Sequence, residues 1–313
     1  MLIHRDTNNL HISGGTTITI GTFDGVHLGH RKLLNRLREA SLENGTESLV
    51  FTFSPHPRHV LFPDQKDLRL LSTNEERAVL MREQGITHLL EYPFTKEFSQ
   101  IDPKEYVEKI LMDQLNMKKI IIGYDHRFGR NRSGSIVLIK ELSTELGFDV
   151  EEISAQEVDS INISSTRIRQ YLLEGKIESA RSLLGYDYFF SGIVAEGKKL
   201  GRQIGFPTAN LSKIDTHKLI PANGVYAVIA ELNGIKRKAM MNIGVNPTTD
   251  QDNQLKIEIN IFDFGEDIYG KQLTIQVKDF IRKEMKFGGL EELKLALGSD
   301  KSRTMEILSA IEL

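Results

Sequence analysis

The sequence predicts a chain of two parts, an α/β unit followed by an all-β unit. Strand and helix patterns alternate through the first half, which indicates a mostly parallel sheet covered by helices on both faces. After Gly185, short alternating strands follow one another without long helices between them. Because 313 residues suffice for two cores, we expect units at residues 1–185 and 186–313.

The first unit shows five strand patterns and the signals that begin and end its helices. Thr73 and Glu76 form a capping-box pattern ahead of an apolar run. Asp102 and Pro103 fit an N-cap and a first helical position, and Gly147 fits the end of a leucine stripe. In such a fold the ligand lies beyond the carboxyl ends of the strands. The expected strands are Thr16–Phe23, Leu49–Phe53, Ile86–Tyr92, Lys119–Gly123 and Asp149–Ser154.

The second unit shows strands of alternating character and one helix. Asn233-Gly234 is a strong hairpin signal between two strand patterns. An antiparallel barrel or sandwich accommodates such strands. Leu290, Leu293 and Leu297 are in helical phase, which predicts a terminal helix. The expected strands are Tyr226–Leu232, Ile235–Ile243, Lys256–Phe264 and Gln272–Phe280.

Composition narrows the class of protein. Forty basic and 43 acidic residues give a net charge of −3, which argues against a nucleic-acid or membrane surface as partner. No apolar run approaches the length of a membrane span, and the N-terminal residues lack a signal-peptide core. The absence of cysteine excludes disulfides and thiolate chemistry. We therefore expect a cytoplasmic protein that binds small molecules.

The segment Gly21–His30 carries the strongest functional signal. His27 and His30 stand one turn apart where a helix begins, and a helix start offers N–H groups and a positive dipole end that suit a phosphate. Each ring can donate an N–H to a phosphate oxygen, and the glycines let the backbone approach a ligand. The alternative is a tight turn with two surface histidines. The pattern H-x-G-H resembles the signature of the nucleotidyltransferase superfamily, which moves a nucleoside monophosphate from ATP to an acceptor.

Three further motifs lie in the first half. The turn Phe53–Pro57 closes the second strand and, alone, indicates only a turn. The loop Gly123–Gly129 can hold a base or ring with Phe128 and supply polar contacts from Asp125 and Arg127, or it is a glycine-bounded turn. In Ile163–Arg169, three hydroxyls and two arginines begin a helix, either as N-caps or as a second phosphate clamp.

The second half has its own phosphate-type pattern. Four glycines between Gly192 and Gly205 make a backbone that can wrap phosphates, or they form a plain barrel loop. Thr208 and Asn210 place two neutral oxygens on one face of an extended segment, which suits Mg²⁺. Glu258 lies in an alternating strand, either as a base at a barrel mouth or as a solvent-facing residue.

Together these motifs resemble the bacterial bifunctional riboflavin kinase/FAD synthetase family over nearly the whole chain. G-T-F-D-G-V-H-L-G-H, P-H-P, G-x-D-x-x-F-G and I-S-S-T-R-I-R are similar to its FMN adenylyltransferase half. G-R-x-x-G-F-P-T-A-N, G-V-Y-A, N-I-G-V-N-P-T and D-I-Y-G are similar to its riboflavin kinase half. The resemblance implies a Rossmann-like nucleotidyltransferase domain at residues 1–185. It implies a six-stranded antiparallel barrel with a terminal helix at residues 186–313.

The resemblance also implies roles in the adenylyltransferase half. His27 and His30 would bind ATP phosphates and stabilise charge during attack on the α-phosphorus, and Asp125 would lie near the flavin and the adenylylation centre. Further flavin contacts would come from His126, Phe128 and, in the kinase half, Arg282. The remaining ATP-binding residues of this half would be Gly21, Phe23, Asp24, Gly25, Gly29, Ser165, Thr166 and Arg169, the last three holding the leaving pyrophosphate.

In the kinase half, Thr208 and Asn210 would contact Mg²⁺ and ATP, and Glu258 would activate the ribityl 5′-hydroxyl of riboflavin. The other ATP-binding residues would be Gly197, Gly201, Arg202 and Pro207. The implied substrates are ATP, riboflavin and FMN, the cofactor is Mg²⁺, and the product is FAD. The oligomeric state stays open, a homo-oligomer included.

Three residues depart from the family pattern: Ser54 in place of Asp, His126 in place of Phe, and Asn260 in place of His. The first alternative function is adenylylation alone, with an inactive kinase-like barrel. A second is a flavin-binding regulator without turnover. A third is a nucleotidyltransferase for another acceptor, such as a pantetheine or nicotinamide compound.

Overall fold

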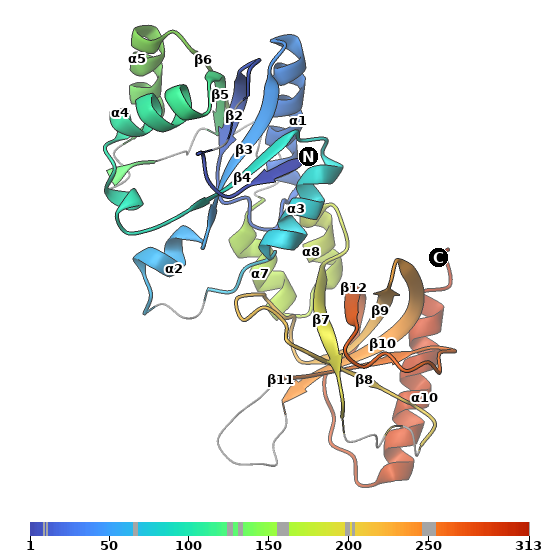
Figure 1. Cartoon of the computed structure of the whole chain (residues 1–313). Coiled ribbons are helices and arrows are strands. Elements are labelled where there is room, and N and C mark those ends of the chain that lie inside the picture. Colours follow the sequence, from blue (N-terminus) through green and yellow to red (C-terminus); the bar gives the residue numbers. More distant parts are fainter. Residues whose placement is uncertain are drawn as a thin grey trace. The chain divides into compact units, whose positions relative to one another are not determined.

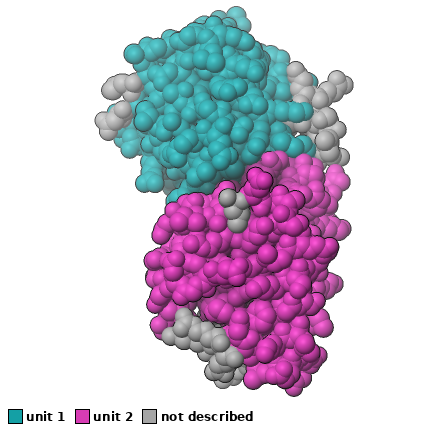
Figure 2. Space-filling view, turned by 90° about the vertical axis from the view of Figure 1, so that its right-hand side faces the viewer, with its two compact units in different colours: residues 1–165 teal, residues 166–313 magenta. Residues whose placement is uncertain are grey.

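The computed structural model of the chain describes residues 1–8, 10, 12–64, 68–123, 128–130, 134–154, 163–197, 201, 204–245 and 255–312. Their contacts form two compact units, Met1–Ser165 and Thr166–Leu313, coloured separately in Figure 2. Helices α7 (Ser165–Leu173) and α8 (Ile177–Leu184) lie between this division and the predicted boundary after residue 185. The predicted boundary therefore stays a prediction, tested below by truncation.

The first unit is built on a six-stranded sheet in which every pair of neighbours is parallel. All five predicted strands are present, with ends shifted by a few residues. The three-residue strand β1 was not predicted, because so short a segment shows no alternation. In spatial order the strands are β1 (Leu2–His4), β4 (His88–Pro93), β3 (Glu47–Ser54), β2 (Thr16–Ile20), β5 (Met117–Gly123) and β6 (Asp149–Ile153).

The helices of this unit begin and end at the predicted signals. Thr73 and Glu76 make both hydrogen bonds of a capping box, Asp102 caps the segment that starts with Pro103, and Gly147 ends its helix with φ 75°. Helices cover both faces of the sheet (Figure 1). The helices of this unit are α1 (Leu28–Glu43), α2 (Pro57–Leu61), α3 (Asn74–Glu83), η1 (Phe98–Gln100), α4 (Pro103–Glu105), the π-helix η2 (Tyr106–Gln114) and α5 (Ile136–Leu146).

The core of the first unit lies between the sheet and these helices. On one face, Phe51 and Ile120 pack with Leu111 of η2 and Leu142 of α5. Leu34 and Leu37 of α1 are also fully buried, but they lie outside this apolar cluster. Because apolar side chains are removed from water on both faces, the strands are held rigidly and their carboxyl ends form a stable platform.

The second unit is a closed antiparallel barrel of six strands, as the family resemblance implied. Asn233 and Gly234, at φ 51° and 79°, form the predicted hairpin turn. Strands β7 and β8 were not predicted, because their glycine-rich surroundings indicated a loop. In spatial order the strands are β10 (Ile235–Val245), β11 (Leu255–Ile261), β8 (Ala209–Ser212), β7 (Phe189–Ala195), β12 (Gln272–Arg282) and β9 (Gly224–Leu232).

The predicted terminal helix, α10 (Leu290–Ile307), packs on β9, β10 and β12 of the barrel (Figure 1). Ala227 and Ile229 of β9 form an apolar cluster with Leu308, just beyond the helix. Nearby, Arg282 of β12 makes a two-pronged ion pair with Asp300 of α10, at 2.8 and 2.7 Å. These contacts attach the helix to the barrel wall.

A truncation tests where the second unit begins. Helices α7 and α8 pack on the barrel: the backbone N–H of Ala222 donates to the carbonyl of Leu172 at 3.0 Å, and Leu184 is fully buried. We expect a fragment of residues 166–313 to be more stable than residues 186–313 by at least about 2 kcal/mol, the contribution of one buried leucine. Urea unfolding followed by circular dichroism measures this difference. Equal stabilities would assign both helices to the first unit.

Candidate active sites

A cavity of about 960 Å³ lies at the carboxyl ends of the parallel strands. Gly21 follows β2, Phe53 lies near the end of β3, Phe94 follows β4 and Gly123 ends β5; all four line the cavity. The chain order reverses between β2 and β5, since strands 3, 4 and 1 lie to one side and strands 5 and 6 to the other. Ligands bind at such a switch point in open α/β sheets. The cavity thus lies where the sequence predicted a ligand.

The segment Gly21–Val26, here called the phosphate loop, turns sharply from β2 into α1. Phe23 and Val26 adopt φ of 48° and 36°, a left-handed backbone that is unusual for a bulky or β-branched residue. Such conformations cost on the order of 1–3 kcal/mol each and persist only where the surroundings impose them. The carboxylate of Asp24 accepts backbone N–H groups of Leu71 and Ser72 at 2.8 and 3.1 Å, which fixes the turn.

The two histidines stack against each other at the start of α1, with ring centroids 3.6 Å apart. His27 is the N-cap, and its Nδ1 accepts the backbone N–H of His30 at 3.3 Å. Since Nδ1 acts as an acceptor, Nε2 of His27 carries the ring proton and can donate it to a ligand. Burial and the neighbouring His27 hold the pKa of His30 well below its usual 6.5. Among the described residues, Nδ1 of His30 is buried without a hydrogen-bond partner.

The predicted site residues of the first half fall into four groups. Asp24 and Gly25 are part of the phosphate loop but do not line the cavity; the N–H of Gly25 donates to Ser72 Oγ. Asp125 and His126 lie outside the described residues, and Thr166 and Arg169 belong to α7 in the second unit. The predicted residues that do line the cavity are Gly21, Phe23, His27, Gly29, His30, Phe128 and Ser165.

An aromatic wall lines the same cavity and was largely missed from the sequence, which indicated only Phe128. Tyr106, at the start of the π-helix η2, is 3% exposed, and its ring lies 5.7 Å from that of Phe128. Its hydroxyl has no hydrogen-bond partner among the described residues, and burial raises its pKa. The sequence signal was the set of aromatics at or beyond the strand ends. The wall consists of Phe53, Phe94, Phe98, Tyr106 and Phe128.

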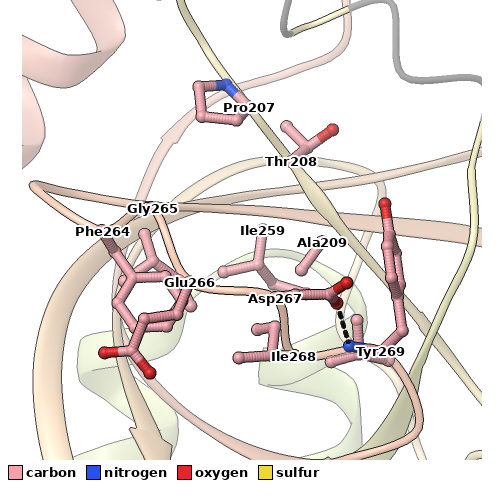
Figure 3. Close-up of a pocket in the computed structure, with 12 residues that line it drawn as sticks. Pro207, Thr208, Ala209, Ile259, Phe264, Gly265, Glu266, Asp267, Ile268 and Tyr269 are labelled. Carbon is pink, nitrogen blue, oxygen red and sulfur yellow. Dashed lines mark hydrogen bonds between the residues drawn. The ribbon is translucent and has the colours of Figure 1, made fainter.

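A second cavity, of about 330 Å³, opens on the barrel of the second unit. Pro207, Thr208 and Ala209 supply one wall, and the segment Phe264–Tyr269 supplies another. Figure 3 shows the rings of Phe264 and Tyr269 on opposite sides, with smaller apolar side chains between them. This shape can take a flat apolar group between two rings, next to the Thr208 hydroxyl.

Strand pairing places two of the predicted kinase residues, Glu258 and Asn210, side by side. Glu258 of β11 lies directly opposite Asn210 of β8 on one side and Asn242 of β10 on the other. The Glu258 side chain is 28% exposed, and its Oε1 lies 2.8 Å from Nζ of Lys256. The carboxylate is therefore a half-buried member of a polar row with a cationic neighbour.

Two glycines allow the backbone to approach Asn210 and the segment before Thr208 closely. A Cβ at Gly197 would lie 2.0 Å from the amide nitrogen of Asn210, and one at Gly201 would lie 2.2 Å from the carbonyl oxygen of Phe206, so both would collide. Thr208 and Asn210 thus offer neutral oxygens beside a backbone that only glycine permits. The described residues contain no cluster of three His, Asp or Glu that would hold a metal by itself. This donor set fits Mg²⁺, which shares its coordination with nucleotide phosphates and water.

Two more residues of this half were predicted. Arg202 falls outside the described residues. Arg282 lines neither cavity, because its guanidinium is held by Asp300 and also lies 5.7 Å from the ring centroid of Phe287.

The fold and the sites define the class of protein. The first unit is a parallel sheet with two histidines at a helix start, a position suited to phosphates, and the second is a closed barrel with its own cavity. The family model for FAD synthetase matches residues 10–167, and that for riboflavin kinase matches residues 184–308.

Two bacterial proteins are similar to this chain over nearly its whole length. The bifunctional riboflavin kinase/FMN adenylyltransferase of Listeria monocytogenes is 36% identical over 94% of this chain and 93% of its own. That of Escherichia coli is 34% identical over 93% and 92%, respectively. The chain therefore belongs to the bifunctional riboflavin kinase/FMN adenylyltransferase family. The match of both domain models argues against adenylylation alone.

A solved structure from Streptococcus pneumoniae, described as a macrolide-efflux protein, has the same two-part fold. It is 30% identical, with a TM-score of 0.86 over 97% of this chain and 98% of that one. In the part of the present chain that the structure describes, every helix is too short or too polar to cross a membrane.

The lowered pKa of His30 predicts a pH-dependent stability. The unfolded chain takes up this proton at a higher pH than the folded chain, so stability falls as the pH drops below 6.5 and is fully present above it. We expect His30→Gln to flatten this fall by at most about 1.4 kcal/mol per pH unit, the effect of one proton. Urea unfolding of both proteins between about pH 5 and 8 measures the slopes. Parallel slopes would show that His30 titrates normally.

Proposed function

We propose that the second unit transfers the terminal phosphate of ATP to riboflavin, and that the first unit transfers AMP from a second ATP to the resulting FMN. The products of the second step are FAD and pyrophosphate. One observation carries the proposal: the chain has two separate cavities, each beside a glycine-rich turn suited to phosphates, within the spans that the two family models match. The cytoplasmic location remains a prediction, and the oligomeric state stays open.

In the first unit, ATP phosphates lie against the start of α1. The Nε2–H of His27 donates to a phosphate oxygen, and neutral His30 completes the pair without adding a fixed charge near the attacking anion. A phosphate oxygen of FMN attacks the α-phosphorus, and pyrophosphate leaves. Donors placed where charge develops lower the barrier. Ser165, which lines the cavity, holds the leaving pyrophosphate. The roles that the resemblance implies for Thr166, Arg169 and Asp125 in this step remain predictions.

The flavin ring binds against the aromatic wall of the first cavity. Phe98 and Phe128 provide apolar faces of the size a tricyclic ring needs. The Tyr106 hydroxyl, left without a partner among the described residues, donates to a polar edge of the flavin. The flavin contact that the resemblance implies for His126, two residues before Phe128 in the sequence, remains a prediction.

In the second unit, Glu258 accepts the proton of the ribityl 5′-hydroxyl as that oxygen attacks the γ-phosphorus of ATP. Lys256 keeps this carboxylate in place beside Asn210. Thr208 and Asn210 would hold Mg²⁺, which supplies neutralisation of phosphate charge when bound. Gly197, Gly201 and Arg202 surround the phosphates, and Pro207 lies at the adenosine end of ATP.

The whole proposal is tested by product analysis. Pure protein incubated with riboflavin, ATP and Mg²⁺ should yield FMN first and then FAD, separated by chromatography. A flavin-binding regulator would bind flavin without consuming ATP. Conversion of supplied FMN to FAD without any phosphorylation of riboflavin, in reducing and in oxidising buffer, would contradict the proposed dual activity.

His30→Ala removes one preorganised group from the phosphate site. We expect FAD formation to fall by roughly 10²–10³-fold, the usual effect of losing such a group. FMN formation from riboflavin should change little, because it occurs in the other unit. Equal losses in both reactions would mean general misfolding or a wrong assignment.

Glu258→Gln keeps the shape of the side chain but removes its basicity. FMN formation should fall by roughly 10²–10⁴-fold, the range of general-base contributions, while FAD formation from supplied FMN persists. Rates are measured separately with riboflavin and with FMN as the flavin substrate. Kinase activity close to that of the wild type would refute the role of Glu258 as the base.

A further inference from the structure

The phosphate loop is held from behind by a side chain that the proposed chemistry does not use. The carbonyl of Thr22 accepts a hydrogen bond from Nη1 of Arg77 at 3.2 Å, and a second from Oγ1 of Thr52 at 3.3 Å. Thr22 lines the cavity, whereas Arg77, in α3, does not. Arg77 therefore acts on the loop from the protein interior.

The same guanidinium reaches a second loop of the cavity. Its Nη2 donates to Oδ1 of Asn74 at 2.8 Å, and Nδ2 of Asn74 donates to Oγ of Ser54 at 2.7 Å. Ser54 ends β3 and is followed by the turn whose His56 and Pro57 line the cavity. Three side chains thus connect the phosphate loop to the turn after β3.

The burial of Arg77 indicates that this connection is specific. The residue is 2% exposed, and its counter-ion Glu91 lies 3.7 Å from Nη2, beyond hydrogen-bond distance. A buried charge with so loose a partner is costly, and in some proteins such a charge is retained because its hydrogen bonds define a geometry. Only a planar guanidinium can bond two acceptors in this fixed arrangement; a lysine keeps the charge but loses the fork.

We propose that Arg77 is a positioning residue for adenylyl transfer: it fixes the phosphate loop relative to the Ser54–Pro57 turn, so that ATP and FMN meet in reacting geometry. The inference rests on the proposed function of the first unit. It deepens that proposal, because Arg77 acts through Thr22, Asn74 and Ser54 and contacts neither substrate. Displacements of about 1 Å by remote changes can cost about 10²-fold in rate, so the effect is measurable.

The test uses the full-length protein and variants at both ends of the connection. Arg77→Lys keeps the charge and removes the fork, and Ser54→Ala removes the last hydrogen bond. Ser48→Ala is the matched control, because Ser48 lies at the other end of β3 and its buried hydroxyl bonds to Thr87. For each protein, kcat and KM are measured for FMN adenylylation and for riboflavin phosphorylation, together with urea unfolding.

We expect Arg77→Lys to lower kcat of adenylylation by about 10²-fold and Ser54→Ala by about 2–10-fold, with KM values and kinase activity little changed. Ser48→Ala should match the wild type in both rates. The double variant should lose little more than Arg77→Lys alone, because Arg77 and Ser54 belong to the same chain of hydrogen bonds. Wild-type adenylylation in Arg77→Lys, equal effects of Ser54→Ala and Ser48→Ala, or additive losses would each overturn the positioning role. If the wild type made no FAD, the proposed function itself would fail.

Discussion

The first site depends on the left-handed backbone of the phosphate loop. At Phe23 and Val26 the chain adopts conformations that neither residue favours alone, so the loop cannot be held by local propensity. It is held by groups from distant segments: the N–H groups of Leu71 and Ser72 on Asp24, and the side chain of Arg77 on Thr22. This arrangement places His27 at the N-cap of α1, where its ring stacks on His30. The strained backbone therefore fixes the positions of the two histidines in the protein before a nucleotide binds.

The second site depends on strand register instead. Glu258, Asn210 and Asn242 come from three strands and form a row only because the barrel pairs β8, β11 and β10 as neighbours. Gly197 approaches Asn210 and Gly201 approaches Phe206 so closely that a Cβ at either position would collide with them. The strand ladder and the glycine backbone together fix where the neutral oxygens of this candidate site lie.

Two departures from the family pattern have structural partners in this chain. The hydroxyl of Ser54 accepts a hydrogen bond from Asn74, whose own amide oxygen accepts one from the buried Arg77. Asn260 donates from Nδ2 to the carbonyl of Pro207 at 2.6 Å and so ties β11 to the segment that carries Thr208. Each substitution therefore keeps a link between two segments of a site. The third departure, His126, lies outside the described residues.

The sequence by itself determined the two-part architecture, the predicted strands, the caps at Thr73, Asp102 and Gly147, and the Asn233-Gly234 hairpin, because these features depend on local periodicity and turn chemistry. Its motifs also indicated both sites, since His27, His30 and Thr208 do line the cavities. Only the tertiary structure decided that the Asp24 carboxylate binds the backbone of Leu71 and that Arg282 pairs with Asp300. It alone showed that Tyr106 faces the first cavity and that Arg77 joins two loops. These contacts join segments that are far apart in the sequence. A local sequence pattern carries no information about which distant segments become neighbours in the fold.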